Sequence, residues 1–259
     1  HGDRRNNRFQ DEREPRVTLA LEVRNLVKKF GGLTATNDLS FDLAKGESLG
    51  LIGPNGAGKT TVFSQIMGEL RQTSGTIKLY GEEISKLTTS ERIAKGVSRT
   101  YQVPRPFAEL SVRENIRVGL MPDSLREMIF GAPDRNREAE LAQSVGFAPK
   151  DLDKTASELA MGDLRKLEFA RTLATGAKLL LLDEVFAGLT SGEIGMIAEL
   201  IQDLRQRGFT YLMVSHDLPA MEPLVDRAIA IERGTMLANG SFADVLGDKS
   251  VRASYLGES

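Results

Sequence analysis

One glycine-rich segment, residues 53–61, constrains the fold of this chain more than any other part of its sequence. The segment follows an apolar run at residues 49–52, which predicts a buried strand. Its glycines allow the backbone to turn several N–H groups towards one point, and a helix that begins near Gly58 adds its positive N-terminal end. The strand, the loop and the helix together match the phosphate-binding P-loop pattern.

Two side chains of this segment indicate the chemistry of the bound group. Lys59 supplies a positive charge for the β- and γ-phosphates, and the hydroxyl of Thr60 is placed to ligate Mg²⁺. An ordinary glycine-rich turn with an exposed lysine is the alternative, but such a turn does not need a strand before it and a helix after it. The predicted phosphate-binding segment consists of Gly53, Pro54, Asn55, Gly56, Ala57, Gly58, Lys59, Thr60 and Thr61.

Composition narrows the classes of function. The 259 residues include 34 Lys and Arg against 36 Asp and Glu, so there is no overall basic field for a nucleic-acid partner. Cysteine is absent, which excludes disulfides and thiolate chemistry, and two histidines, His1 and His216, exclude a histidine-rich metal site. No run approaches the ~18 apolar residues that span a bilayer. Residues 1–16 are predicted to be a polar N-terminal tail without a fixed role.

Strand and helix patterns alternate along the rest of the chain. Alternating or continuous apolar runs predict strands at residues 19–23, 39–43, 49–52, 76–80, 97–101, 178–183, 209–215, 228–231 and 235–238. Helical spacing predicts helices at residues 61–70, 90–95, 164–174 and, after a capping box formed by Thr190 and Glu193, up to Gly208.

This order predicts an α/β fold of the P-loop nucleotide hydrolase class. We expect a mostly parallel central sheet, an antiparallel β edge before the P-loop, and a helical subdomain at about residues 103–176, all within one domain of residues 17–259. Ligands of such sheets bind beyond the carboxyl ends of the strands. The P-loop, Gln102, Asp183 and His216 all follow predicted strands, so we expect them to meet there.

The order of these features along the chain resembles the ATP-binding subunits of ABC transporters over roughly residues 19–240. The resemblance rests on Phe30, the P-loop, Gln102, residues 159–163, residues 182–184 and His216. It implies an ATPase with ATP and Mg²⁺ as cofactors.

The resemblance also assigns roles at the nucleotide. Phe30 would stack on the adenine, and Asp183 would hold Mg²⁺ through water, together with Thr60 and Gln102. Glu184 would polarise the attacking water, and His216 would contact the γ-phosphate. The implied catalytic residues are Glu184, His216, Gln102 and Lys59. Purely structural roles are the alternatives: Phe30 as a core aromatic, Asp183 as a helix cap, Gln102 as a loop amide and His216 as a core histidine.

A further set of residues would act on the nucleotide of another subunit. In the family a signature segment and an interface loop face the partner's site, so hydrolysis needs a second ATP-binding subunit, either a copy or a related chain. The matching signature residues are Leu159, Ala160, Met161, Gly162 and Asp163, and the matching loop residues are Ala187, Gly188, Leu189 and Thr190.

Other expectations follow from the resemblance alone. They are membrane-spanning permease subunits that contact residues 102–107, a periplasmic solute-binding protein in an importer, and a peripheral position on the cytoplasmic face of the membrane. No direct nucleic-acid partner is expected.

Five positions depart from the usual family pattern. The common signature has Ser, Gly and Gln where this chain has Ala160, Met161 and Asp163, so a phosphate donor is lost and the backbone and Gly162 remain. Val185 replaces a usual proline, and Thr190 replaces a usual Asp or Asn. These changes are expected to slow or retune hydrolysis without abolishing it.

Within the family, residues 31–37, 164–168 and 255–258 look like those of branched-chain amino-acid importer ATPases. Lipopolysaccharide-export ATPases share much of this pattern and remain an alternative. A soluble ABC-type ATPase that acts on DNA or ribosomes would need a coiled-coil insertion, tandem halves or a basic face. A P-loop kinase or GTP-binding switch would leave Gln102, the signature and His216 without roles.

Overall fold

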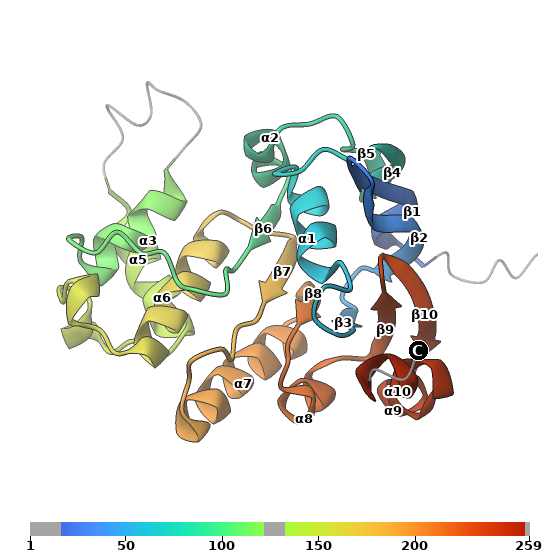
Figure 1. Cartoon of the computed structure of the whole chain (residues 1–259). Helices are drawn as coiled ribbons and strands as arrows, with labels where there is room; N and C mark the ends of the chain where they lie inside the picture. The colour runs from blue at the N-terminus through green and yellow to red at the C-terminus, as the bar shows by residue number, and fades with distance from the viewer. Residues whose placement is uncertain (1–16, 122–132, 257–259) are drawn as a thin grey trace, which may run out of the picture.

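The computed structural model describes residues 17–121 and 133–256, which form two β-sheets with helices between and around them (Figure 1). The polar tail expected at residues 1–16 lies outside the described residues, as do Gly257 and Glu258 of the C-terminal motif. None of the described helices has the length and apolar character needed to cross a bilayer.

The larger sheet has six strands in the order β10-β9-β3-β8-β7-β6. Its neighbouring strands are parallel except for β9 and β10, which form an antiparallel hairpin. The α/β fold with a mostly parallel central sheet is therefore confirmed. The strands are β3 (Ser48–Ile52), β6 (Val97–Arg99), β7 (Leu179–Asp183), β8 (Thr210–Val214), β9 (Arg227–Glu232) and β10 (Thr235–Gly240).

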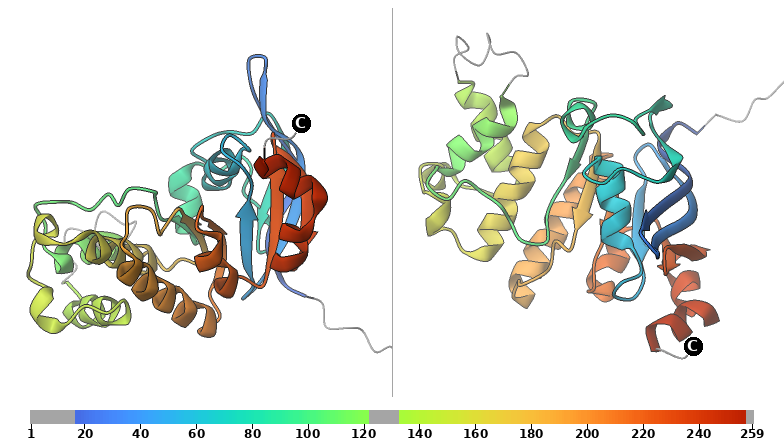
Figure 2. Two further views of the ribbon diagram at one scale, coloured as in Figure 1. Left: turned by 60° about the horizontal axis from the view of Figure 1, so that its bottom comes forward. Right: turned by 45° about the horizontal axis from the view of Figure 1, so that its top comes forward.

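The smaller sheet is antiparallel and has the order β2-β1-β4-β5. Its strands are β1 (Leu19–Phe30), β2 (Leu33–Ala44), β4 (Ser74–Leu79) and β5 (Glu82–Glu83). The first two strands form a long hairpin that stands out from the molecule in the left view of Figure 2.

Helix α1 (Lys59–Met67) lies between the two sheets (Figure 1). Its buried side chains Val62, Phe63 and Ile66 belong to one core cluster with residues of both sheets, such as Leu21 of β1 and Leu181 of β7. The helix that follows the P-loop is thereby fixed against two surfaces at once.

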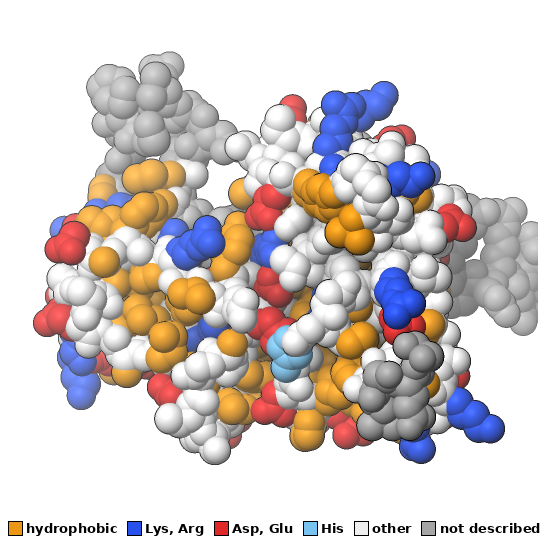
Figure 3. Space-filling model, viewed as in Figure 1, with side chains coloured by type: hydrophobic (Ala, Val, Ile, Leu, Met, Phe, Trp, Pro, Cys, Tyr) orange, Lys and Arg blue, Asp and Glu red, His pale blue; other side chains and the backbone are white. Residues whose placement is uncertain are grey.

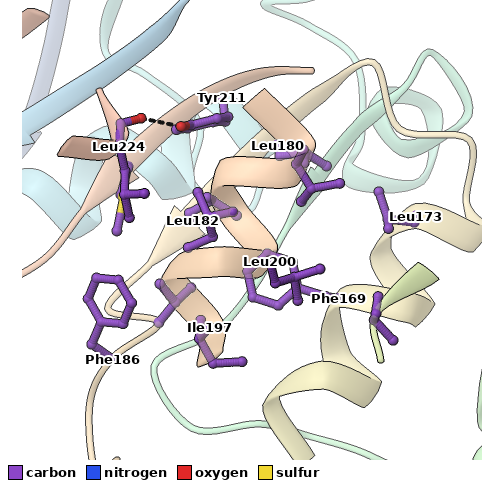
Figure 4. Close-up of a cluster of buried hydrophobic side chains, with 14 of the residues drawn as sticks. Phe169, Leu173, Leu180, Leu182, Phe186, Ile197, Leu200, Tyr211 and Leu224 are labelled. Carbon is purple, nitrogen blue, oxygen red and sulfur yellow. Dashed lines mark hydrogen bonds between the residues drawn. The ribbon is translucent and has the colours of Figure 1, made fainter. Parts of the chain in front are cut away.

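The opposite face of the large sheet packs on α7 (Ser191–Gln206) and α6 (Met161–Ala174) (Figure 4). Leu180 and Leu182 of β7 point into this second cluster, whereas Leu179 and Leu181 point into the first. Both faces of β7 are buried, which explains why its sequence is a continuous apolar run.

The remaining helices complete the shape. Helices α3, α5 and α6 lie together at one side, away from α9 and α10 beside β9 and β10 (Figures 1 and 2). The helices other than α1, α6 and α7 are α2 (Thr89–Ala94), α3 (Val112–Leu120), α5 (Arg135–Ser144), α8 (Leu218–Met221), α9 (Phe242–Gly247) and α10 (Lys249–Leu256), with 3-10 turns at Pro149–Asp151, Ala156–Glu158 and Glu222–Leu224.

Several predicted boundaries were wrong for local reasons. Strand β1 runs to Phe30 instead of ending near residue 23, because it pairs with β2 as far as the hairpin turn. Helix α1 begins earlier and ends earlier than residues 61–70, since Gly68 adopts a left-handed conformation with φ 77° and caps it. Strand β6 ends at Arg99 because the next amide but one, that of Tyr101, bonds to a side chain instead of the sheet.

The α6 boundary matters for the site. Sequence spacing placed the start of this helix after residue 163, but the helix begins at Met161. Ala160 is therefore the N-cap residue, and Gly162 and Asp163 lie in the first turn. By contrast, the capping box of Thr190 and Glu193 at the start of α7 is confirmed.

Candidate functional site

A cleft of about 1000 Å³ lies at the carboxyl end of the large sheet. Acidic side chains border a histidine in the middle of this face of the molecule (Figure 3). The cleft brings together most of the residues that sequence analysis singled out for the nucleotide: Phe30, Asn55, Gly56, Ala57, Gly58, Lys59, Thr60, Thr61, Gln102, Asp183, Glu184 and His216.

The P-loop conformation depends on two glycines that have no room for a side chain. A Cβ atom on Gly53, whose φ is 155°, would lie 2.2 Å from the carbonyl oxygen of Ile231. A Cβ atom on Gly58, whose φ is 107°, would lie 2.5 Å from the carbonyl oxygen of Ala35. Both positions therefore require glycine on steric grounds, and Gly58 leads directly into α1.

Lys59 closes the P-loop on itself. Its Nζ atom donates to the carbonyl oxygens of Gly53, at 2.7 Å, and Pro54, at 3.0 Å. Burial lowers the pKa of Lys59, and the nearby carboxylates of Glu184 and Asp183 partly offset that effect. The ammonium group is thus held where the loop opens into the cleft.

Asp183 stands at the end of β7 and is held by a buried arginine. Its Oδ2 atom accepts a hydrogen bond of 2.6 Å from Nη2 of Arg99. The same guanidinium also donates to Ser64 within α1, at 3.1 Å, and to Glu69 just after this helix, at 2.6 Å. Arg99 therefore fixes one carboxylate oxygen of Asp183 and links β6, β7 and α1.

Glu184 has an uncommon backbone conformation, with a φ of 50°. Its N–H donates to the carbonyl oxygen of Val214 at 2.9 Å, while its Oε2 atom accepts a 3.0 Å bond from the N–H of His216. The Oε1 atom lies 3.3 Å from Nε2 of the same histidine, whose side chain is 58% exposed. The carboxylate is therefore oriented by one residue and still faces the cleft.

Phe30 and Gln102 lie at the edges of the cleft. Phe30 ends β1 and is 48% exposed, with Nζ of Lys28 5.0 Å from the centre of its ring. An exposed aromatic face at this position is suited to stacking on a flat ring. Gln102 is exposed, and its backbone carbonyl accepts a 2.9 Å bond from Nη2 of Arg165.

The signature residues of this chain do not line the cleft of the same chain. None of the residues 159–163 or 187–190 lines the cleft described above. Ala160 provides no side-chain cap to α6, and the Gly162 N–H instead donates to Oε1 of Glu193, at 2.9 Å. The loop of Ala187, Gly188, Leu189 and Thr190 joins β7 to α7, so the signature and this loop are neighbours through Glu193.

The donors in the cleft fit Mg²⁺ better than a softer metal. The hydroxyl of Thr60, the amide of Gln102 and the carboxylate of Asp183 are hard oxygen ligands that line one cleft. Among residues 17–121 and 133–256 there is no group of three or more His, Cys, Asp or Glu side chains that could hold a metal unaided. A metal bound by one or two protein oxygens together with phosphate oxygens is typical of Mg²⁺ sites.

Three residues that shape the cleft were not predicted from the sequence. Arg99, Glu168 and Arg165 are buried and bond to or beside predicted site residues. A signal for Arg99 exists in the sequence, because an arginine within a short apolar strand needs a buried acidic partner. The spacing of Arg165 and Glu168, three residues apart on one helix, marks a possible ion pair but not its target.

Comparison with known proteins gives consistent matches. The family described as "ABC transporter" matches residues 36–187. The chain is 37% identical over 250 residues to the high-affinity branched-chain amino acid transport ATP-binding protein LivG of Escherichia coli (strain K12), covering 92% of this chain and 98% of that protein. It is 34% identical over 238 residues to the lipopolysaccharide export system ATP-binding protein LptB of Haemophilus influenzae, covering 92% of this chain and 97% of that protein.

Solved structures agree with these matches. A nucleotide-free ATP-binding cassette from an ABC transporter superposes with a TM-score of 0.83 at 28% identity, covering 93% of this chain and 100% of that one. The ADP conformation of an ATP-binding cassette of an ABC transporter superposes with a TM-score of 0.82, also at 28% identity, covering 93% of this chain and 99% of that one.

Proposed function

The chain belongs to the ABC transporter family as an ATP-hydrolysing subunit, and from that premise we propose that it powers the import of branched-chain amino acids. The observation that carries the proposed cargo is the 37% identity to LivG along 92% of the chain. The predicted family, fold class and ATPase activity are confirmed by the same matches. The relation to LptB is somewhat weaker, at 34%, so lipopolysaccharide export is the alternative cargo.

The cleft holds the nucleotide through groups of this chain. Phe30 stacks on the base, while the amides of the P-loop and Lys59 bind the β- and γ-phosphates. Thr60, Gln102 and Asp183 would hold Mg²⁺, which when bound neutralises charge on the phosphate oxygens. The structure of a 28% identical cassette in its ADP conformation supports nucleotide binding here.

Glu184 acts as the base. The bond from the His216 N–H directs the carboxylate towards the cleft, where it orients the attacking water and accepts its proton. The water oxygen bonds to the γ-phosphorus as the bond from that phosphorus to the bridging oxygen breaks, which releases ADP and phosphate. The exposed imidazole of His216 contacts the γ-phosphate. Arg99 keeps Asp183 in place by binding one of its oxygens, which leaves the other free to face the metal.

A second ATP-binding subunit, a copy of this chain or a related one, completes the site. The signature and the loop of residues 187–190 lie outside this chain's cleft, where they can face the nucleotide of a partner. Because Ala160 lacks a hydroxyl, the phosphate contact falls to backbone N–H groups at the start of α6, and the Gly162 N–H takes part only if it leaves Oε1 of Glu193.

The remaining partners follow from the transport function. Membrane-spanning permease subunits dock near residues 102–107, where Val103 is 66% exposed and Phe107 is 47% exposed. In this proposal the chain lies on the cytoplasmic face of the membrane, and a periplasmic solute-binding protein delivers the amino acid to the permease.

Uptake by cells tests the cargo. In cells of the parent organism from which the gene for this chain has been deleted, we expect accumulation of labelled leucine, isoleucine and valine to fall. Expression of the parent chain should restore accumulation, whereas expression of Glu184→Gln should not. A matched control is uptake of an unrelated amino acid, which should not change. Unchanged leucine uptake combined with defective lipopolysaccharide export would replace the proposed cargo with the alternative.

A further inference from the structure

Two buried side chains of α6 hold the backbone at Gln102. Arg165 is fully buried, and its Nη1 atom donates to the carbonyl oxygen of Tyr101 at 2.6 Å. Its Nη2 atom donates to the carbonyl oxygen of Gln102 at 2.9 Å. Glu168 accepts the N–H of Tyr101 at 2.7 Å through Oε1, and its Oε2 atom binds Nη1 of Arg165 at 2.6 Å.

A buried ion pair such as Arg165 and Glu168 is not the most effective way to stabilise a fold. A buried ion pair repays its loss of hydration only when additional hydrogen bonds complete it, and apolar pairs of similar volume often stabilise as well or better. Here the additional bonds go to three backbone groups of Tyr101 and Gln102. Burial raises the pKa of Glu168, an effect that Arg165 opposes.

The helix that carries this pair begins at the signature. Gly162 lies in the first turn of α6, and Arg165 lies one turn further on. Gln102 lines the cleft of its own chain, whereas residues 159–163 lie outside that cleft. The pair therefore connects the residue at one nucleotide with the helix that faces another.

We propose that Arg165 and Glu168 are positioning residues that set the location of Gln102 in the cleft through its backbone and make it follow any movement of α6. The proposal rests on the proposed role of Gln102 in ATP hydrolysis. It assigns the pair no contact with the nucleotide. Removing the pair should leave ATP binding nearly intact and slow turnover, since Gln102 would no longer be held at the metal and the water.

A second arginine–glutamate pair in the same region provides a matched control. Glu138 of α5 is fully buried, and its Oε1 atom accepts a 2.6 Å bond from Nε of Arg117 in α3. Neither residue of this pair is bonded to Tyr101 or Gln102. Its loss should have comparable structural consequences without moving Gln102.

The test compares R165M/E168L with R117M/E138L in the intact chain. For R165M/E168L we expect kcat to fall about tenfold or more, as for a misplaced catalytic group, with KM changed less than about threefold. Hydrogen exchange at the Tyr101 amide should accelerate, because its acceptor is lost. The control variant should change neither kcat nor this exchange rate.

Introducing the same changes in Gln102→Ala separates positioning from general damage. If the pair acts through Gln102, its loss should add little to the effect of Gln102→Ala, which is a non-additive result. If R165M/E168L does not fold, R165M/E168Q takes its place in both measurements of kcat. The glutamine of this variant retains an acceptor for the Tyr101 N–H.

Two results would overturn the proposal: parental kcat in the folded variant, or a full multiplicative loss on the Gln102→Ala background. Failure of the proposed function is a different outcome, since the parent chain itself would then hydrolyse no ATP.

Discussion

At the scale of single residues, the site depends on a glutamate with a strained backbone. Glu184 is not a glycine, yet its φ is 50°, a conformation that costs of order 1 kcal/mol or more. The bond of its N–H to the Val214 carbonyl and the burial of the following Val185 hold it there. The strained backbone is consistent with a residue whose side chain must point into the cleft.

A buried tyrosine makes stability depend on pH at the alkaline end. Tyr211 of β8 is fully buried, and its hydroxyl donates to the carbonyl oxygen of Leu224 (Figure 4). Burial raises the pKa of Tyr211 to about 12. In the unfolded chain its pKa is about 10, so between about pH 10 and pH 12 the unfolded chain loses a proton that the folded chain keeps.

The contribution of Tyr211 to the free energy of unfolding should therefore be complete below about pH 10. The free energy of unfolding should fall by about 2 kcal/mol between pH 10 and pH 12. Tyr211→Phe should lower stability at neutral pH but remove this share of the pH dependence. Urea unfolding of both proteins across this range measures the difference. Parallel curves for the two proteins would exclude Tyr211 as the titrating group.

At the scale of elements, α1 illustrates how a helix end is supported from outside. Arg92 of α2 is 1% exposed and donates to the carbonyl oxygens of Gln65 and Ile66 at the C-terminal end of α1. It also donates to the carbonyls of Leu87 and Ser85. A cation at the carbonyl end of a helix is favourable to the helix dipole, and burial lowers the pKa of this one.

We predict that Arg92→Met lowers the free energy of unfolding by about 3 kcal/mol, because several buried carbonyl groups lose their donor at once. The P-loop end of α1 lies at the opposite end of the helix, so ATP affinity of the folded fraction should change little. Denaturant unfolding and nucleotide titration measure the two quantities.

Lys95→Met is the matched control. Lys95 caps the same helix, α2, but its ion pair with Glu82 is exposed, and exposed pairs contribute little to stability. Equal losses for Arg92→Met and Lys95→Met would show that the buried carbonyl contacts are not the source of the effect.

The sequence predicted the large elements better than their contacts. Residues 49–52 and 178–183 could be identified as buried strands because both faces are apolar, and the P-loop followed from its glycines. The meeting of the P-loop with Asp183 and His216 followed from parallel strands ending at one edge. By contrast, the bond from Arg165 to the Tyr101 carbonyl joins residues 64 apart, and no local pattern encodes such a pairing.

At the scale of the whole molecule, the proposed function needs two separate surfaces for nucleotide. Its cleft collects the P-loop, Asp183, Glu184 and His216, whereas the signature at the start of α6 lies outside that cleft. Helix α6 connects the two through its hold on Gln102. On that proposal, a subunit completes its site only when another subunit supplies the second surface.

Steady-state phosphate release at saturating Mg-ATP tests whether Glu184 acts as the base for ATP hydrolysis in this cleft. The comparison is between the parent, Glu184→Gln and Glu199→Gln, the last being an exposed glutamate of α7. We expect Glu184→Gln to lower turnover by about 10² or more with ATP affinity retained, and Glu199→Gln to match the parent. Equal turnover in the parent and Glu184→Gln would show that Glu184 is not the base.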